Sequence, residues 1–237
     1  MPWVVSFAGQ KGGVGKSILS QGFAVASVEA GDKVILGDLD IAQRTTYEWG
    51  QWREKSKILP AVDVRLIDPD RSPDFGIRAM GDDVGLLVLD APGWSDEKTL
   101  LLAGYSDLLV LPTGASVADL RPTLRLIFEL QEKGVEPSRI ITALCRIHTD
   151  AEIKFAKDYL AEAGTVAAAG ALREQAEFQR LANQGKSICE ATGSGMRSQA
   201  IKLVGSIRDS LRQEQQRQQA KPMVFHAEPK IFKGNAR

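Results

Sequence analysis

Short runs of aliphatic and β-branched residues alternate along the chain with stretches in which apolar residues recur every three or four positions. Several of these runs are apolar at consecutive positions, which is typical of strands covered on both faces. Six strands are predicted, at Trp3–Ala8, Lys33–Asp38, Val62–Asp68, Val84–Asp90, Asp107–Leu111 and Arg139–Ile147. Between the last two strands, one helical stripe is predicted from Val117, Leu120, Leu124, Ile127 and Phe128.

The alternation of strands and helices predicts the fold class. Strands joined by helices form parallel sheets with helices on both faces. After the last strand we expect helices near Glu152–Ala163 and Glu174–Asn183, and a longer one through Ile201, Val204, Ile207 and Leu211. The prediction is a single α/β domain at 1–212 with a mostly parallel, twisted sheet. A basic, Gln-rich flexible tail broken by prolines is expected at 213–237.

Composition agrees with one globular domain. The 237 residues are 43% hydrophobic and 25% charged, with a formal net charge of zero. From residue 196 onward, nine basic residues face three acidic ones, so this end carries +6 and the rest −6. Cys145 and Cys189 lie far apart, outside any metal-ligand spacing, which predicts buried thiols in a reducing compartment. Without a signal peptide or an apolar run of ~20 residues, we expect a cytoplasmic protein.

The stretch GQKGGVGKS, residues 9–17, lies between the first predicted strand and the first helix. A glycine-rich loop there can bring its backbone N–H groups close to a polyphosphate. Lys16 is predicted to reach the β- and γ-phosphates of ATP, and the Ser17 hydroxyl to bind Mg²⁺. Gln10 stands where the P-loop pattern GxxxxGK[ST] has its first glycine. The predicted nucleotide site comprises Gly12, Gly13, Val14, Gly15, Lys16, Ser17 and Ile18.

This loop, read as QKGGVGKS, resembles the deviant Walker A motif of the ParA/MinD superfamily of ATPases. In that family the early lysine reaches across a dimer interface to phosphates bound by the other subunit. The resemblance therefore implies an ATP-dependent homodimer in which Lys11 acts on the partner's nucleotide. For Lys11 taken by itself, a solvated loop lysine is the alternative.

Two further motifs follow in the order that the family has. LGDLDIAQ resembles the DxDPQ switch, which implies that Asp38 lies near the metal and that Asp40 orients or activates the attacking water. Ile41 and Ala42 replace the usual proline and add one residue. An aspartate at a strand end can also simply cap a helix. VGLLVLDAPG resembles a Walker B strand, whose Asp90 would hold Mg²⁺ through water.

The similarity covers roughly residues 4–211. SDLLVLPTGASVADL places Asp119 before a helix that lies at the dimer face in relatives. ALCRI resembles the strand beside the adenine, which would put Arg146 near the base, with Cys145 at a usually polar position. LREQAEFQRLANQGKSICE resembles the family's C-terminal segment, and Trp49 is a feature of small, plasmid-type ParF-like members.

Motifs that the sequence lacks argue against some branches of this superfamily. The phosphate loop begins at residue 9, which predicts no N-terminal helix-turn-helix and no specific operator binding. No cysteine follows the predicted Walker B strand, and no CxxC occurs, so the iron–sulfur branches are not favoured.

The predicted function is a ParA-type partition ATPase. Its Mg-ATP dimer would bind DNA without sequence preference and move plasmid or other cargo over the nucleoid, stimulated by a ParB-like centromere-binding adaptor. Charge on the last helix supports DNA binding, although such a helix face is often only solvated. The candidate DNA contacts are Arg197, Lys202, Arg208 and Arg212.

Two alternative functions stay open. In a MinD-like membrane protein, Val224, Phe225, Ile231 and Phe232 would insert into lipid, but Pro222 and Pro229 interrupt that helix and argue against it. A metabolic ligase of the same fold, similar to dethiobiotin synthetase, is the third reading. Relatives of that class lack a lysine at the position of Lys11.

Overall fold

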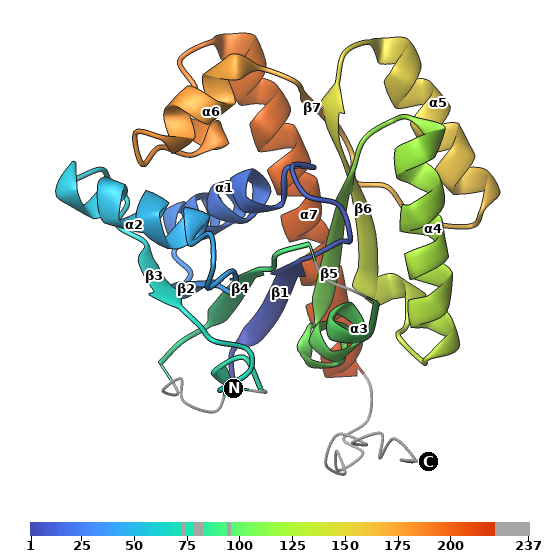
Figure 1. Ribbon diagram of the computed structural model, residues 1–237, viewed down its shortest axis with the longest axis horizontal. Helices are drawn as coiled ribbons and strands as arrows, with labels where there is room; N and C mark the ends of the chain where they lie inside the picture. The colour runs from blue at the N-terminus through green and yellow to red at the C-terminus, as the bar shows by residue number, and fades with distance from the viewer. Residues whose placement is uncertain (73, 78–82, 94–95, 221–237) are drawn as a thin grey trace.

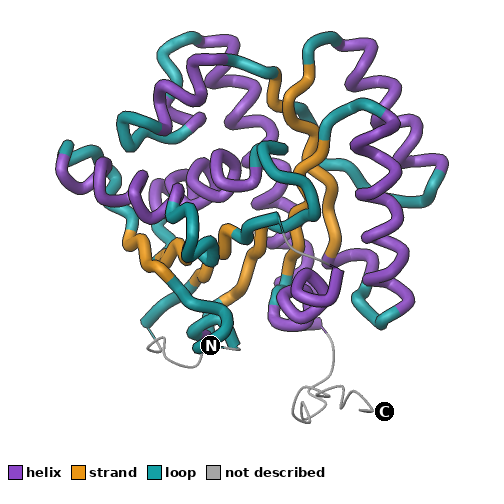
Figure 2. Tube along the Cα trace, viewed as in Figure 1, coloured by secondary structure: helices purple, strands orange, loops and turns teal. Residues whose placement is uncertain are grey.

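The computed structural model describes residues 1–72, 74–77, 83–93 and 96–220, and within them seven strands form one sheet between two layers of helices (Figures 1 and 2). The strands are β1 (Trp3–Phe7), β2 (Val34–Asp38), β3 (Asp63–Leu66), β4 (Leu86–Asp90), β5 (Leu108–Thr113), β6 (Ile140–Ile147) and β7 (Leu172–Arg173). The helices are α1 (Lys16–Glu29), α2 (Thr45–Lys55), α3 (Asp96–Tyr105), α4 (Val117–Glu132), α5 (Asp150–Glu162), α6 (Ala176–Ala182) and α7 (Ser194–Ala220), with short 3₁₀ turns η2 (Pro137–Arg139) and η3 (Ile188–Glu190).

The sheet has the strand order β3-β2-β4-β1-β5-β6-β7, and every neighbouring pair is parallel. This confirms the predicted α/β class. Because all strands run the same way, their carboxyl ends meet at one edge of the sheet. At that edge Asp38 of β2 pairs in register with Asp90 of β4, and Phe7 of β1 lies on the other side of Asp90.

Two apolar cores explain why the central strands lack an alternating pattern of buried and exposed residues. On one face, β1 residues such as Val5 and Phe7 pack with side chains of α1, α6 and α7. On the opposite face, Val4 and Leu87 pack with side chains of α3, α4 and α5. All five residues of β4 are therefore buried, as the sequence predicts for strands covered on both sides.

The predicted stripe on α4 is only partly right. Leu120, Leu124 and Ile127 are buried, but Val117 and Phe128 are 38% and 43% exposed. The buried face also includes Leu126 and Leu130, so its centre is rotated away from the predicted stripe. Val117 and Phe128 lie at its rim for that reason.

The predicted tail boundary at residue 213 is wrong, because α7 continues through Ala220. Glu214 is 1% exposed and accepts hydrogen bonds from the Ser138 hydroxyl at 3.1 Å and the Gln218 amide at 3.3 Å. Polar contacts hold this Gln-rich turn of helix, so an apolar pattern could not reveal it. Residues 221–237, with the apolar positions considered for membrane binding, lie outside the described residues. Within the described part of the chain, no helix combines the length and apolar character that crossing a bilayer requires.

Candidate functional site

The loop from Gly9 to Gly15 joins β1 to α1 at the carboxyl edge of the sheet. Gly13 and Gly15 have φ angles of 71° and 102°, a left-handed conformation that glycine adopts without strain. Helix α1 then begins at Lys16 with no side-chain cap and no acidic residue in its first turn. Its first N–H groups therefore lack side-chain partners, an arrangement that favours an anion at this helix end.

Lys16 lies inside this loop and is only 7% exposed. Its ammonium donates a hydrogen bond to the Lys11 carbonyl at 2.7 Å. Burial lowers the pKa of Lys16, while the charges of Asp90 and Asp40 act in the opposite direction. The loop thus holds a cation beside two carboxylates, close to the first N–H groups of α1.

Asp90 ends β4 beneath the loop and is 3% exposed. Burial raises its pKa to about 7, although the hydroxyl groups of Thr46 and Ser17 act against that shift. Its Oδ2 accepts a hydrogen bond from the Thr46 hydroxyl at 2.6 Å, whereas its buried Oδ1 has no partner among the described residues. A buried carboxylate oxygen without a donor is where a cation would compensate the charge.

The oxygen atoms at this position suit Mg²⁺ as ligands. The ion prefers oxygen ligands and usually keeps several waters, so it needs few protein groups besides substrate phosphates. Ser17 and Asp90 supply a hydroxyl and a carboxylate oxygen at the end of the phosphate loop. The chemistry of this pair fits the predicted metal.

Asp38 is engaged differently from Asp90. Its Oδ2 accepts the N–H groups of Thr46 and Tyr47, and its Oδ1 accepts the N–H of Asp40, each at 2.9 Å. Burial raises the pKa of Asp38, and these three backbone hydrogen bonds lower it. Asp38 therefore anchors the start of α2, the capping role weighed from the sequence, and its contact with metal stays a prediction.

Asp40 lies at the more open side of the site and is half-buried. Its Oδ1 accepts the Gln43 N–H at 2.9 Å, which closes a turn over residues 41–43. That turn accommodates the extra residue of the switch, and Arg44 follows it with a φ of 53°. Asp40 is near enough to favour the charged form of Lys16. Its action on a water stays a prediction.

Thr46 and Gln21 belong to this site but were not predicted from the sequence. Both are buried, and Gln21 donates through Nε2 to the Thr46 hydroxyl at 3.0 Å. Thr46 thus receives a hydrogen bond from α1, donates one to Asp90 and anchors on Asp38. No motif indicated this, because a threonine near a helix start is usually read as a helix-terminal residue.

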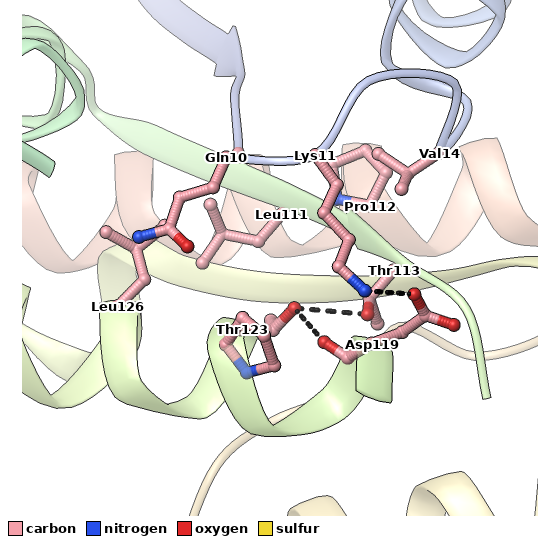
Figure 3. A pocket seen from close by; sticks show the side chains of 11 residues that line it. Gln10, Lys11, Val14, Leu111, Pro112, Thr113, Asp119, Thr123 and Leu126 are labelled. Carbon is pink, nitrogen blue, oxygen red and sulfur yellow. Dashed lines mark hydrogen bonds and ion pairs between the residues drawn. The ribbon is translucent and has the colours of Figure 1, made fainter. Parts of the chain in front are cut away.

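Lys11 points from the loop toward the start of α4 (Figure 3). Its ammonium donates to Asp119 Oδ1 at 2.7 Å and to the Ala118 carbonyl at 2.5 Å. Although burial acts to raise it, the pKa of Asp119 is below its usual value because Lys11 and Ser116 hydrogen-bond to the carboxylate. The single chain thus binds Lys11 through its own residues, with 42% of the lysine side chain exposed.

Arg146 lies at the end of β6, at the same edge of the sheet. It has a φ of 58°, and its guanidinium is 3.4 Å from the Glu174 carboxylate. The preceding residue, Cys145, is buried against the phosphate loop: a Cβ on Gly15 would lie 3.3 Å from its sulfur. The predicted buried state of Cys145 is confirmed, as is that of Cys189. A role for Arg146 beside the base stays a prediction.

The four candidate DNA contacts on α7 are not equivalent. Arg197 and Lys202 are exposed. Arg208 is 17% exposed and pairs with Asp32 at 3.1 Å, and Arg212 pairs with Asp209 at 3.4 Å. The structure thus leaves Arg197 and Lys202 freest to meet a phosphate backbone, and DNA binding itself stays a prediction.

An ion pair between a buried arginine and a half-buried glutamate was also not predicted. Arg53 of α2 is 1% exposed and donates to both carboxylate oxygens of Glu190, at 2.8 and 3.2 Å. It also donates to the carbonyls of Pro60 and Gly185. The bonds to Gly185 and Glu190 tie α2 to η3 and to the segment before it. One arginine in a polar helix carries no sequence signal for burial.

Comparison with known proteins identifies the family of this site. The sequence profile of the CobQ/CobB/MinD/ParA nucleotide-binding domain matches residues 5–224. The match confirms the predicted superfamily. No curated protein matches the chain.

Solved structures share the fold at low sequence identity. MinD from Pyrococcus horikoshii with Mg-ADP superposes with a TM-score of 0.70 at 16% identity, covering 90% of this chain and 99% of that one. A putative plasmid partition protein from Borrelia burgdorferi bound to AMPPNP gives 0.65 at 15%, covering 90% and 100%. McdA from Cyanothece, in an ATP complex, gives 0.66 at 15%, covering 89% and 96%.

Proposed function

Because the chain belongs to the CobQ/CobB/MinD/ParA nucleotide-binding domain family, we propose that it is an ATPase that dimerises with Mg-ATP and positions DNA-linked cargo. The observation that carries this proposal is the pair of lysines in one loop: Lys16 lies inside the loop, and Lys11 extends away from it. In this proposal Lys16 binds the chain's own nucleotide, and Lys11, once released from Asp119, binds the nucleotide of a partner subunit.

The phosphates of ATP would bind at the start of α1. The free N–H groups of its first turn and the Lys16 ammonium both complement negative charge there. To reach the phosphates, Lys16 has to exchange the Lys11 carbonyl for a phosphate oxygen. Ser17 and Asp90 would hold Mg²⁺, which neutralises charge on the phosphate oxygens when bound. Thr46 and Gln21 keep Asp90 in place.

Hydrolysis would depend on the switch that carries Asp40. In this proposal the Asp40 carboxylate accepts a hydrogen bond from the attacking water and aligns it with the γ-phosphate. The turn over 41–43 and the anchoring of α2 on Asp38 support a defined position for that carboxylate. Lys11 would break its contacts with Ala118 and Asp119 and stabilise the phosphates of the nucleotide bound by the second subunit.

DNA binding and partition form the finer part of the proposal. Exposed cations on α7, above all Arg197 and Lys202, would contact DNA phosphates without reading sequence. This reading rests on those exposed cations, because MinD superposes on the chain at least as well as the plasmid partition protein does. A ParB-like adaptor would stimulate hydrolysis, and the ATP dimer would reside on the nucleoid in the cytoplasm.

Co-sedimentation tests this function. Wild type, Lys11→Ala and Asp40→Ala are each incubated with nonspecific DNA or with anionic lipid vesicles, in ATP or ADP, at two salt concentrations. We expect ATP-dependent DNA retention for wild type and Asp40→Ala, weaker at high salt, and none for Lys11→Ala.

Two results would contradict the proposal. Retention on vesicles in place of DNA would identify a membrane-positioning ATPase. Equal DNA retention with ATP and ADP would remove the nucleotide switch.

A further inference from the structure

A proline inside α4 changes the hydrogen bonding of that helix next to Lys11. Helix α4 runs from Val117 to Glu132 and contains Pro122. In an α-helix the N–H of residue 122 would donate to the Ala118 carbonyl, four residues earlier. Proline has no N–H, and its ring pushes against that same carbonyl. Pro122 therefore leaves the Ala118 carbonyl without its helical donor.

Lys11 takes up this free acceptor. Its ammonium lies 2.5 Å from the Ala118 carbonyl oxygen and 2.7 Å from Asp119 Oδ1. Figure 3 shows the lysine extending across to the first turn of α4, where Asp119 meets it. One carbonyl released by a proline and one carboxylate thus bind the same cation.

The carboxylate of this pair is itself fixed in position. The Ser116 hydroxyl donates to Asp119 Oδ2 at 2.6 Å, and the Asp119 N–H donates back to Ser116 at 3.2 Å. Gly114 leaves space for it, because a Cβ there would lie 2.5 Å from Asp119 Oδ2. The cavity beside Lys11, of about 20 Å³, holds no more than about one water. Ser116 therefore helps to hold the carboxylate to which Lys11 binds.

We infer that Pro122 is a positioning residue that keeps Lys11 on its own chain in the free monomer, so that assembly must first break this contact. Lys11, Ala118, Asp119 and Pro122 are called the lysine latch below. The inference rests on the proposed function, in which Lys11 acts on the nucleotide of the second subunit. Because the latch must open before two chains assemble, it weakens dimerisation, and Pro122 in α4 determines by how much.

The expected effect is modest, because the latch is partly solvated. The side chains of Lys11 and Asp119 are 42% and 28% exposed, so water screens their attraction. Losing the Ala118 acceptor, or the negative charge of Asp119, would free Lys11 about threefold more often in each monomer. Two latches open for each dimer, so the apparent Kd of the dimer would fall about tenfold.

The first arm of the test examines the monomer without nucleotide. Pro122→Ala restores an N–H at position 122, which can reclaim the Ala118 carbonyl, and hydrogen exchange of that amide reports whether it does. The acetylation rate of the Lys11 amine, followed by mass spectrometry, then reports how often the lysine is free. We expect about threefold faster labelling in Pro122→Ala and in Asp119→Asn. Glu132→Ala, an exposed change near the end of the same helix, should label like wild type.

Unchanged Lys11 labelling in Pro122→Ala would overturn the latch whatever the protein does with ATP, and whether or not the new amide is protected, because Pro122 would then have no influence on Lys11. This readout also separates a latch from mere stabilisation of α4, since a firmer helix alone does not change the reactivity of Lys11.

The second arm measures dimerisation with AMPPNP by analytical ultracentrifugation. Pro122→Ala should form dimers at about tenfold lower protein concentration than wild type or Glu132→Ala. If wild type and Pro122→Ala both form dimers at the same concentration although labelling differs, control of assembly by the latch is wrong. If neither forms a dimer at any concentration while labelling differs, the proposed function fails and the contact in the monomer stands.

Discussion

At the scale of single residues, Asp90 is a buried carboxylate whose charge the surrounding residues compensate only in part. The carboxylate is buried, one oxygen accepts a hydrogen bond from Thr46, and the other has no partner among the described residues. Burial raises its pKa to about 7. A cation bound at this oxygen would compensate the negative charge of the carboxylate. Metal binding is therefore coupled to the charge of this one side chain.

The raised pKa predicts how stability depends on pH. Asp90 binds a proton more tightly in the folded chain than in the unfolded one, so its contribution is fully present below pH ~4 and is lost as pH rises through about 7. Without metal, wild type should lose up to about 4 kcal/mol relative to Asp90→Asn between pH 4 and pH 8. Urea unfolding of both proteins over that pH range measures the difference. Parallel curves would show that Asp90 ionises normally.

Thr46 is predicted to be the residue that orients Asp90. Thr46→Val keeps the shape of the side chain but removes a donor to Asp90 and an acceptor for Gln21. We expect about 1–3 kcal/mol loss of stability from these unmade bonds, and weaker Mg²⁺-dependent binding of a fluorescent ATP analogue. Thr46→Ser should restore much of both. If Thr46→Val binds Mg-nucleotide like wild type, Asp90 needs no support from α2.

Some residues of the site can be recognised from their neighbours in the sequence, and others cannot. Lys16, Ser17 and Asp90 were predicted because their chemistry follows from neighbours in the chain, a glycine loop and a buried strand. Thr46 acquires its role from Asp90, which lies 44 positions away, and a single sequence does not show that contact.

At the scale of elements, α2 connects the switch to the back of the molecule. Its first turn is anchored on Asp38, and its last turn carries Arg53, which binds Glu190 and two carbonyls. The Trp49 indole donates to the Lys186 carbonyl at 3.0 Å. The helix is therefore held at both ends by polar contacts, and the position of Asp40 depends on a helix with little freedom.

Removing the buried Arg53 partner of the Arg53–Glu190 ion pair should destabilise the whole domain. Arg53→Met fills similar space but leaves the Glu190 carboxylate without its cation, and we expect a loss of about 3–5 kcal/mol. Arg65→Met is the matched control, because Arg65 pairs with Asp63 at a surface where both side chains are 49% exposed. That control should change stability by less than about 1 kcal/mol. Equal losses in the two variants, measured by urea unfolding, would show that the buried pair has no special weight.

Helices were predicted less accurately than strands, for a physical reason. Strands β1, β2, β4, β5 and β6 have buried apolar runs, whereas β3 has no buried residue and the two-residue β7 was not predicted. Helix α7 extends beyond its apolar residues because Glu214 and Gln218 bind residues from other elements. An apolar pattern reports burial against a core and is silent about ends held by hydrogen bonds.

At the scale of the whole molecule, the parallel sheet gathers the site from four strands. The phosphate loop follows β1, the switch follows β2, Asp90 ends β4 and the Lys11 contact follows β5. The alternation of strands and helices predicted this arrangement, since parallel strands bring their carboxyl ends together. The sequence could not show that Lys11 binds α4 of its own chain, because its partners there lie more than 100 positions away.

The central claim is that Lys11 joins two chains through their nucleotides. Light scattering after gel filtration with AMPPNP and Mg²⁺ measures it directly, together with fluorescent-nucleotide binding. Wild type should have a mass near twice the 25.8 kDa of one chain. Lys33→Ala, an exposed change at the opposite edge of the sheet, should behave the same way. Lys11→Ala should bind nucleotide with similar affinity yet have the mass of one chain. A Lys11→Ala protein that still forms a nucleotide-dependent dimer would contradict the account.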